Sequence, residues 1–220
     1  MNSDQALQGQ VALVTGAARG IGASTAELLA ARGAIVHVTD ILDCSATVAA
    51  VTAAGGEAHP HQLDVRDRDG CAELADSIRA AHGRIDALVC NAGVCPPGSV
   101  AGDWEQWNRV IEINLHGTQN CVAAVWDGMC AAGGGRIVIV SSMAYYRGGI
   151  IVGSEYTASK AALVGMTRHL ARNGGEFGIN CNAVAPGIIE TDMTASFDKP
   201  DLTEIPLRRY GTAAEVAGPI

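Results

Sequence analysis

Tyr156 and Lys160 are four positions apart in the run EYTASKAAL. Residues four apart on a helix lie on one face, so this spacing makes a phenol and an ammonium neighbours. A free phenol has a pKa near ~10 and releases its proton poorly at neutral pH. An adjacent ammonium stabilises the phenolate and lowers that pKa, which suits acid–base catalysis. The same spacing also occurs on ordinary exposed helix faces, so the pair needs support from the rest of the chain.

A glycine-rich turn lies near the N-terminus, in QVALVTGAARGIG. The pattern predicts a buried strand over residues 11–15, then the turn, then a helix. Gly16, Gly20 and Gly22 let the backbone approach a pyrophosphate closely, and a helix N-terminus offers N–H groups and a positive dipole end to the anion. The spacing is TGxxxGIG, with three residues between the first two glycines. The alternative is a glycine-rich turn that binds no ligand.

Asp40 ends a second apolar run, AIVHVTD, over residues 34–40. A dinucleotide-binding fold carries its ribose-binding carboxylate roughly 20 residues past the glycine turn. A carboxylate there accepts hydrogen bonds from ribose hydroxyls and repels a 2′-phosphate, so we expect NAD, with NADP less favoured. Arg19, inside the turn, acts in the opposite sense because a guanidinium pairs well with phosphate. Asp40 as a simple cap of the next helix is the alternative.

Together these motifs resemble the short-chain dehydrogenase/reductase family, in its NAD-preferring branch, from Val11 to about Ile220. The TGxxxGIG and YxxxK motifs occur in the family's order. Asp64, in LDV, matches the adenine-contacting residue at the end of the third strand, and Asn91 begins a match to the family's NNAG motif in which Cys90 replaces the first Asn. The resemblance implies cofactor contacts at Gly16, Arg19, Gly20, Ile21, Gly22, Asp40, Asp64, Val65, Asn91, Ala92, Gly93, Tyr156, Lys160, Pro186, Gly187, Ile189 and Thr191.

The resemblance also implies the catalytic residues Asn114, Ser142, Tyr156 and Lys160. Tyr156 would exchange a proton with an alcohol or ketone while hydride moves to or from the nicotinamide, and Lys160 would hold the nicotinamide ribose. Ser142 would hydrogen-bond the substrate oxygen, and Asn114 would support a water chain. Substrate contacts are expected at Ser142, Met143 and Tyr156.

The segment between Ser142 and Tyr156 departs from the family pattern because it is one residue longer. The loop over residues 143–153 is therefore expected to bulge. Ser141 precedes the catalytic serine on the same strand and should point to the other face, where it makes a structural hydrogen bond.

Apolar runs alternate with alanine-rich stretches along the chain. The runs cover residues 85–90 and 137–140, and the stretches cover residues 23–32 and 72–81. Such alternation predicts an α/β fold with a single Rossmann-type doubly wound parallel sheet and helices on both faces. One long helix is expected over residues 103–131.

Residues 1–220 are expected to form one dinucleotide-binding catalytic domain, with a substrate loop at about 188–210. By resemblance, the family continues past Ile220 through a last strand, which this chain is expected to lack. The same resemblance implies a homodimer or homotetramer.

Composition agrees with a compact soluble enzyme. The net charge of −8 disfavours nucleic acid as a partner. No apolar run approaches the ~20 residues needed to span a bilayer, so no membrane partner is expected. The polar N-terminus lacks a signal peptide's apolar core, and seven cysteines without a CxxC pattern indicate reduced thiols and a cytoplasmic location.

Some residues that can bind metals or react are expected to have no such role. Cys90 and Cys95 are expected to be structural thiols because no cationic group is near them in sequence. His59 and His61 flank Pro60 without a third ligand at metal-binding spacing, so we expect surface residues and no metal site.

The sequence therefore predicts an oxidoreductase that transfers hydride between NAD(H) and a secondary alcohol or ketone, with a tyrosine as general acid and base. One alternative is an NADPH-linked 3-oxoacyl-carrier-protein reductase. Another is a truncated dinucleotide-binding module without catalysis. The expected pocket is mostly apolar, which does not select one alcohol or ketone.

Overall fold

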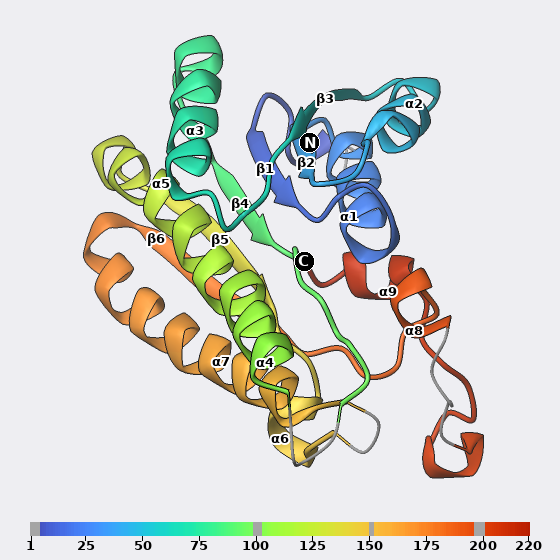
Figure 1. The fold of residues 1–220 in the computed structure, drawn as a ribbon. Helices are drawn as coiled ribbons and strands as arrows, with labels where there is room; N and C mark the ends of the chain where they lie inside the picture. Colours follow the sequence, from blue (N-terminus) through green and yellow to red (C-terminus); the bar gives the residue numbers. More distant parts are fainter. Residues whose placement is uncertain (1–4, 99–102, 150–151, 196–200) are drawn as a thin grey trace.

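The computed structural model describes residues 5–98, 103–149, 152–195 and 201–220. Its centre is a six-stranded parallel sheet in the order β3-β2-β1-β4-β5-β6 (Figure 1). The strands are β1 (Val11–Thr15), β2 (Ile35–Asp40), β3 (Glu57–Gln62), β4 (Ala87–Cys90), β5 (Gly135–Val140) and β6 (Ile179–Val184). This is the doubly wound order in which the direction of winding reverses between β1 and β4. The predicted fold class is confirmed.

Helices cover both faces of the sheet. The α-helices are α1 (Gly20–Ala31), α2 (Ser45–Ala53), α3 (Arg68–His82), α4 (Trp104–Ile111), α5 (Gly117–Ala132), α6 (Ala144–Arg147), α7 (Ser154–Gly174), α8 (Asp192–Ala195) and α9 (Ala213–Ala217). Short 3₁₀ turns are η3 (Gly175–Phe177) and η4 (Leu202–Glu204). One buried cluster packs α3, α5 and α7 against the sheet, and a second packs α1 and α2 against the opposite face. Within β1, Val11 and Leu13 face the first cluster and Val14 faces the second, as the alternation of a pleated strand requires.

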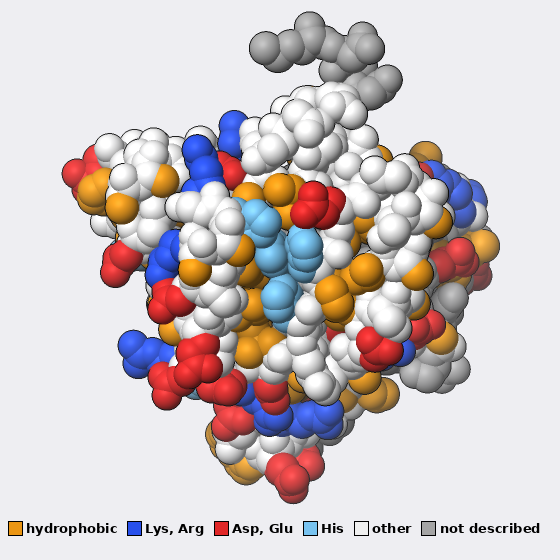
Figure 2. Space-filling view, turned by 90° about the horizontal axis from the view of Figure 1, so that it is seen from above, with side chains coloured by type: hydrophobic (Ala, Val, Ile, Leu, Met, Phe, Trp, Pro, Cys, Tyr) orange, Lys and Arg blue, Asp and Glu red, His pale blue; other side chains and the backbone are white. Residues whose placement is uncertain are grey.

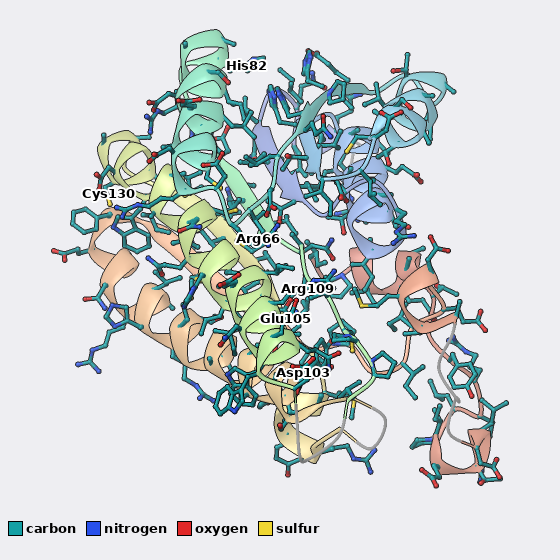
Figure 3. The ribbon with its side chains drawn as sticks, in the orientation of Figure 1. Arg66, His82, Asp103, Glu105, Arg109 and Cys130 are labelled. Carbon is teal, nitrogen blue, oxygen red and sulfur yellow. The ribbon has the colours of Figure 1, made fainter. Side chains whose placement is uncertain are left out.

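The predicted long helix is a continuous helical segment in three parts. Asp103 caps α4 by accepting a hydrogen bond from the Glu105 backbone N–H at 2.9 Å, and both residues are labelled in Figure 3. A π-helical turn, η2 (Glu112–His116), then separates α4 from α5. Such turns widen a helix and frequently occur at functional sites. Asn114 lies within η2.

Strand β3 ends earlier than the sequence analysis expected, so Asp64 lies two residues beyond the strand. His59, Pro60 and His61 lie inside it. Proline is tolerated because β3 is an edge strand, where one side of the backbone needs no partner. Both histidines are half-buried, and at the surface the histidine side chains form one contiguous patch (Figure 2).

Two predicted loops extend beyond the described residues. The bulge expected over residues 143–153 contains α6, and residues 150–151 of it lie outside the described part. The substrate loop at about 188–210 contains α8 and η4, and residues 196–200 of it lie outside as well. Among the described helices, none combines the length and apolar character that crossing a membrane requires.

Candidate active site

The turns after β1 and β4 meet where the winding of the sheet reverses. The Asn91 side-chain amide donates to the backbone oxygens of Thr15 at 3.0 Å and Gly16 at 2.8 Å. The Thr15 hydroxyl accepts from the backbone N–H groups of Asn91 and Ala92, both at 3.1 Å. Open α/β sheets bind ligands in the crevice at this position. Asn91 and Ala92 thus lie where the sequence analysis placed them, and Asn91 braces the glycine turn.

The glycine turn is packed too closely for side chains. A Cβ on Gly22 would lie 2.2 Å from the Gly16 backbone oxygen, and one on Gly16 would lie 2.7 Å from the Ala92 Cα. Gly20 has a φ of 59°, in the left-handed region. The first turn of α1, which contains Ile21, carries no acidic residue, and no side chain caps its N-terminus. Its N–H groups are thus suited to an anion, so the turn fits a pyrophosphate.

Asp40 is tied to the same turn. Its carboxylate accepts from the Ala18 backbone N–H at 3.1 Å and from that of Leu42 at 3.0 Å. It does not cap the next helix, because the N-cap of α2 is Cys44. The helix-cap alternative is therefore wrong, and Asp40 lies half-buried at the carboxyl end of β2.

Asp64 has a partner that the sequence analysis did not anticipate. The Arg66 guanidinium donates to its carboxylate, with Nε 2.9 Å from Oδ2, and these hydrogen bonds lower the Asp64 pKa. Arg66, labelled in Figure 3, lies on the α5 side, where its backbone oxygen accepts from Asn120. Val65 is buried against Gly117, where a Cβ would lie 2.4 Å from the Val65 Cγ2.

Helix α7 begins at the other end of the crevice and carries the tyrosine–lysine pair. The Lys160 ammonium lies 5.7 Å from the centre of the Tyr156 ring and donates to the Val140 backbone oxygen at 2.8 Å. The hydroxyl of Ser142, which follows β5, shares a hydrogen bond with the Tyr156 phenol. The Ser141 hydroxyl donates to the Lys160 backbone oxygen at 2.8 Å. The predicted structural role of Ser141 is confirmed.

Burial controls the protonation of this pair. It raises the Tyr156 pKa above its ordinary value, while the hydrogen bond with Ser142 acts in the opposite sense. It also lowers the Lys160 pKa to about 8. The expectation that the ammonium lowers the pKa of the phenol is not met in this structure, because desolvation of the phenolate is the larger effect.

Asn114 fixes the turn after β4. Its side chain is fully buried, accepts from the Val94 backbone N–H at 2.8 Å and donates to the Val94 oxygen at 3.0 Å. It also donates to the Ser159 hydroxyl on α7 at 3.1 Å. A Cβ on Gly93 would lie 3.2 Å from the Asn114 Oδ1 and 3.5 Å from the Lys160 Nζ. The bare backbone of Gly93 thus leaves room beside both side chains.

The segment after β6 folds back over the site. The Pro186 backbone oxygen accepts from the Met143 N–H at 2.9 Å, and a Cβ on Gly187 would lie 3.5 Å from the Met143 sulfur. Ile189 forms an isolated parallel bridge with Gly211.

Further along this segment, Thr191 and Asp192 reach the glycine turn. The Thr191 methyl lies 3.4 Å from the position of a Cβ on Gly20. Asp192 forms an exposed ion pair with Arg19 at 3.1 Å. The structure thus brings the predicted residues of this segment to the crevice, next to the glycine turn and Met143.

Glu155 on α7 and Gln106 on α4 form a contact that the sequence pattern does not reveal. Glu155 is 2% exposed and accepts from the Gln106 side-chain amide at 2.7 Å. An acid in the first turn of a helix is commonplace, so the pattern did not reveal its burial. Gln106 also donates to the Pro97 oxygen at 3.1 Å. Glu155 thus links the start of α7 to the loop after β4.

Cys95 contacts the Tyr156 phenol and lies near the Lys160 ammonium. The fold thus brings a cation from a distant part of the chain to Cys95, which the local sequence did not show. Burial nevertheless outweighs the ammonium and raises the Cys95 pKa to about 12, so the thiol stays protonated. The neutral Cys95 thiol therefore lines the site beside the Tyr156 phenol.

The expected substrate side is more open. The side chains of Met143 and Tyr145 are 39% and 37% exposed, and Tyr146 is 81% exposed. Tyr146 and Arg147, both in α6, are exposed.

Comparison with known proteins agrees with this geometry. Residues 10–201 match the family model described as short chain dehydrogenase. The chain is 41% identical to a 3-oxoacyl-[acyl-carrier-protein] reductase from Synechocystis sp., over 98% of this chain and 89% of that protein. It is 42% identical to cis-4-hydroxycyclohexanecarboxylate dehydrogenase from Sinomonas cyclohexanicum, over 87% of this chain and 78% of that protein.

A solved structure of a short-chain type dehydrogenase/reductase from Mycobacterium marinum superimposes with a TM-score of 0.92. It is 31% identical, over 96% of this chain and 87% of that chain. The family model spans most of the chain, and the relatives exceed 30% identity over nearly all of it. The chain therefore belongs to the short-chain dehydrogenase/reductase family of nicotinamide-dependent oxidoreductases.

Proposed function

We propose that this protein is an NAD(H)-dependent oxidoreductase acting on a secondary alcohol or ketone. The observation that carries the proposal is the contact of Tyr156 with Ser142 and Lys160 beside the crevice at the ends of β1 and β4. A bound nicotinamide cofactor supplies or accepts the hydride. The protein contributes placement of the substrate and transfer of the proton.

Tyr156 is the proposed general acid and base. Because burial raises its pKa, the phenol is protonated at neutral pH and is suited to donate its proton to a ketone oxygen. In the reverse direction it takes the proton of an alcohol. Ser142 is the proposed second donor to the same substrate oxygen, so the two hydroxyls fix its position.

Lys160 is proposed to bind the nicotinamide ribose and to keep a positive charge beneath the tyrosine ring. Its ammonium is already oriented by the Val140 backbone oxygen. Asn114 is proposed to hold the turn after β4 in place and to support a water chain for the proton. Its contacts with Val94 and Ser159 support the positioning role.

The proposed preference for NAD rests on Asp40. The backbone N–H groups of Ala18 and Leu42 hold its carboxylate at the end of β2. A 2′-phosphate placed there would meet a negative charge. The competing cation, Arg19, is engaged by Asp192 at 3.1 Å, although an exposed pair of this kind is weak and exchanges readily.

A second candidate is an NADPH-linked 3-oxoacyl-carrier-protein reductase. The name of the Synechocystis relative supports it, as does Arg19, whose guanidinium would pair with a 2′-phosphate if it left Asp192. A non-catalytic dinucleotide-binding module is the remaining alternative, and it predicts cofactor binding without turnover.

Steady-state kinetics with both cofactors distinguishes these functions. We expect NAD(H) to give the higher kcat/KM on a panel of secondary alcohols and ketones, and Asp40→Asn to narrow the gap to NADP(H). Higher kcat/KM with NADPH on an acetoacetyl thioester would instead establish the reductase. Calorimetric NAD binding with no turnover across the panel would establish the binding module.

A further inference from the structure

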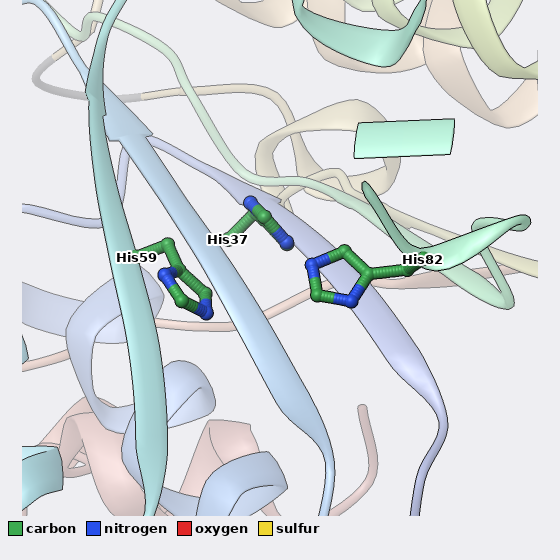
Figure 4. Close-up of side chains that lie close together, drawn as sticks. All are labelled: His37, His59 and His82. Atoms are coloured by element: carbon green, nitrogen blue, oxygen red, sulfur yellow. The ribbon is translucent and has the colours of Figure 1, made fainter. Parts of the chain in front are cut away.

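Four of the six histidines gather at the β2–β3 edge of the sheet, away from the catalytic pair on α7. His37 on β2 is the register partner of His59 on β3, so both imidazoles emerge side by side. His61 follows on β3, and His82 is the last residue of α3. Figure 4 shows His82 directed from the end of α3 toward His37, with His59 on the neighbouring strand. We call these four side chains the histidine cluster.

Three members of the cluster are close enough to share an ion. One ring nitrogen from each of His37, His59 and His82 lies within 4.8 Å of the others. Tetrahedral zinc with Zn–N bonds of about 2.0–2.1 Å needs nitrogens roughly 3.4 Å apart. His59 and His82 are only half-buried, so small side-chain rotations can close the remaining distance.

His37 is buried with one ring nitrogen unused. The residue is 4% exposed, and its Nε2 has no hydrogen-bond partner among the described residues. Its Nδ1 lies 2.8 Å from the His61 Nε2. Native structures rarely leave a buried polar atom without a partner, because its lost contact with water is then not replaced. A metal ion would satisfy it.

One ring nitrogen of His37 and one of His59 already have a hydrogen-bond partner. Glu57 Oε1 lies 2.9 Å from the His59 Nε2, and His61 occupies the Nδ1 of His37. Metal-binding histidines commonly have their second ring nitrogen held by a carboxylate or another acceptor, which fixes the ring orientation. Figure 2 shows the cluster reaching the surface between apolar side chains, so an ion has an entry path.

We propose that His37, His59 and His82 bind a divalent transition cation of the zinc class, with His61 and Glu57 orienting the rings. Three imidazoles leave a fourth position open for water. Imidazole ligands favour Zn²⁺, Ni²⁺ and Cu²⁺ over Mg²⁺ and Ca²⁺. Because the ligands come from β2, β3 and α3, the ion would link these three elements and stabilise the fold.

Zinc titration of the tag-free, metal-stripped protein tests the proposal. Isothermal titration calorimetry should give one Zn²⁺ per chain. His59→Gln and His82→Gln should each weaken binding at least tenfold, because each removes one of three ligands. The matched control is His169→Gln, an exposed histidine on α7 outside the cluster, which should bind zinc as the wild type does. Zinc, but not magnesium, should raise the melting temperature of the wild type and the control.

Two outcomes would overturn the proposal. One is the absence of stoichiometric zinc binding by the wild type at micromolar concentrations. The other is unchanged affinity in His59→Gln and His82→Gln variants whose metal-free melting temperatures match that of the wild type.

Cobalt spectroscopy identifies the ligands even if one variant fails to fold. Co²⁺ bound to the wild type should show the visible absorption of nitrogen ligation. A thiolate charge-transfer band would assign the ion to cysteines and refute the site.

Discussion

Thr15 and Thr39 are register partners on β1 and β2, yet their hydroxyls have opposite surroundings. The Thr15 hydroxyl donates to the Val89 oxygen at 3.3 Å and accepts two backbone N–H groups of the turn after β4. The Thr39 hydroxyl is fully buried and has no hydrogen-bond partner among the described residues. The Thr15 hydroxyl therefore holds the turns at the crevice together, whereas the Thr39 hydroxyl makes no hydrogen bond within the described residues.

The same contrast separates the two halves of the sheet. In the catalytic half, the buried polar side chains of Asn114, Ser141 and Lys160 are all hydrogen-bonded within the protein. Both unpartnered buried side-chain atoms in the described chain lie on β2, in His37 and Thr39. The catalytic half is therefore preorganised by its own contacts. Strand β2, in contrast, carries two buried polar atoms without a hydrogen-bond partner in the described chain.

The largest expected effect is at the glycine turn. Gly22→Ala places a methyl 2.2 Å from the Gly16 backbone oxygen, and the turn must distort. We expect loss of measurable cofactor binding by calorimetry together with a lower melting temperature. The control is Gly165→Ala on α7, where a Cβ meets nothing within 4 Å. It should stabilise the helix by about 0.5–1 kcal/mol and leave cofactor affinity unchanged. Wild-type affinity in Gly22→Ala would contradict the close packing of this turn.

Thr15→Val should be the next most costly change. It leaves the N–H groups of Asn91 and Ala92 without their acceptor, and each unsatisfied group costs about 1–3 kcal/mol. We therefore expect a loss of about 3 kcal/mol in the free energy of unfolding, measured by urea denaturation. A loss below about 0.5 kcal/mol would mean that water replaces the hydroxyl and that the crevice is not held as described.

Lys160 predicts a pH-dependent stability. Its pKa is about 8 in the folded protein and 10.5 without burial, so the unfolded chain binds more protons between these values. Stability should therefore rise with pH across this window relative to Lys160→Met, by about 2 kcal/mol from pH 7.5 to 9.5. Urea denaturation of both proteins at the two pH values measures the difference. Parallel pH profiles would show that the lysine is not desolvated.

Thr39→Val should have the smallest effect, and the opposite sign from Thr15→Val. The substitution removes an unpartnered buried hydroxyl and keeps the side-chain shape, so we expect a gain of about 1 kcal/mol in the free energy of unfolding. Urea denaturation beside Thr15→Val gives the comparison directly. Destabilisation by Thr39→Val would show that the hydroxyl has a partner and would remove the contrast between the two strands.

Local spacing explains why the sequence analysis could name candidate residues for the crevice. The glycine turn, the NAG turn and the Tyr156–Lys160 pair are each encoded within a few consecutive residues. The doubly wound topology then brings the ends of their elements together. Strand β1 occupies residues 11–15 as predicted.

Contacts between distant segments explain what the sequence analysis missed. His37 and His82 are 45 positions apart, and only the register of β2 with β3 and the end of α3 bring them together. Likewise, the burial of Glu155 depends on its contact with Gln106 on α4, 49 positions away in the chain. Burial also raises the pKa of Tyr156, and the spacing of Tyr156 and Lys160 gives no information about burial.

The proton-transfer role of Tyr156 is tested most directly by Tyr156→Phe, which removes the phenolic oxygen and keeps the ring over Lys160. With a substrate identified from the alcohol and ketone panel, kcat should fall by about 10²–10⁴-fold, as expected for loss of a general acid–base group. The cofactor Kd from calorimetry should stay close to that of the wild type. A Tyr156→Phe enzyme that binds cofactor normally and turns over at the wild-type rate would contradict the proposed mechanism.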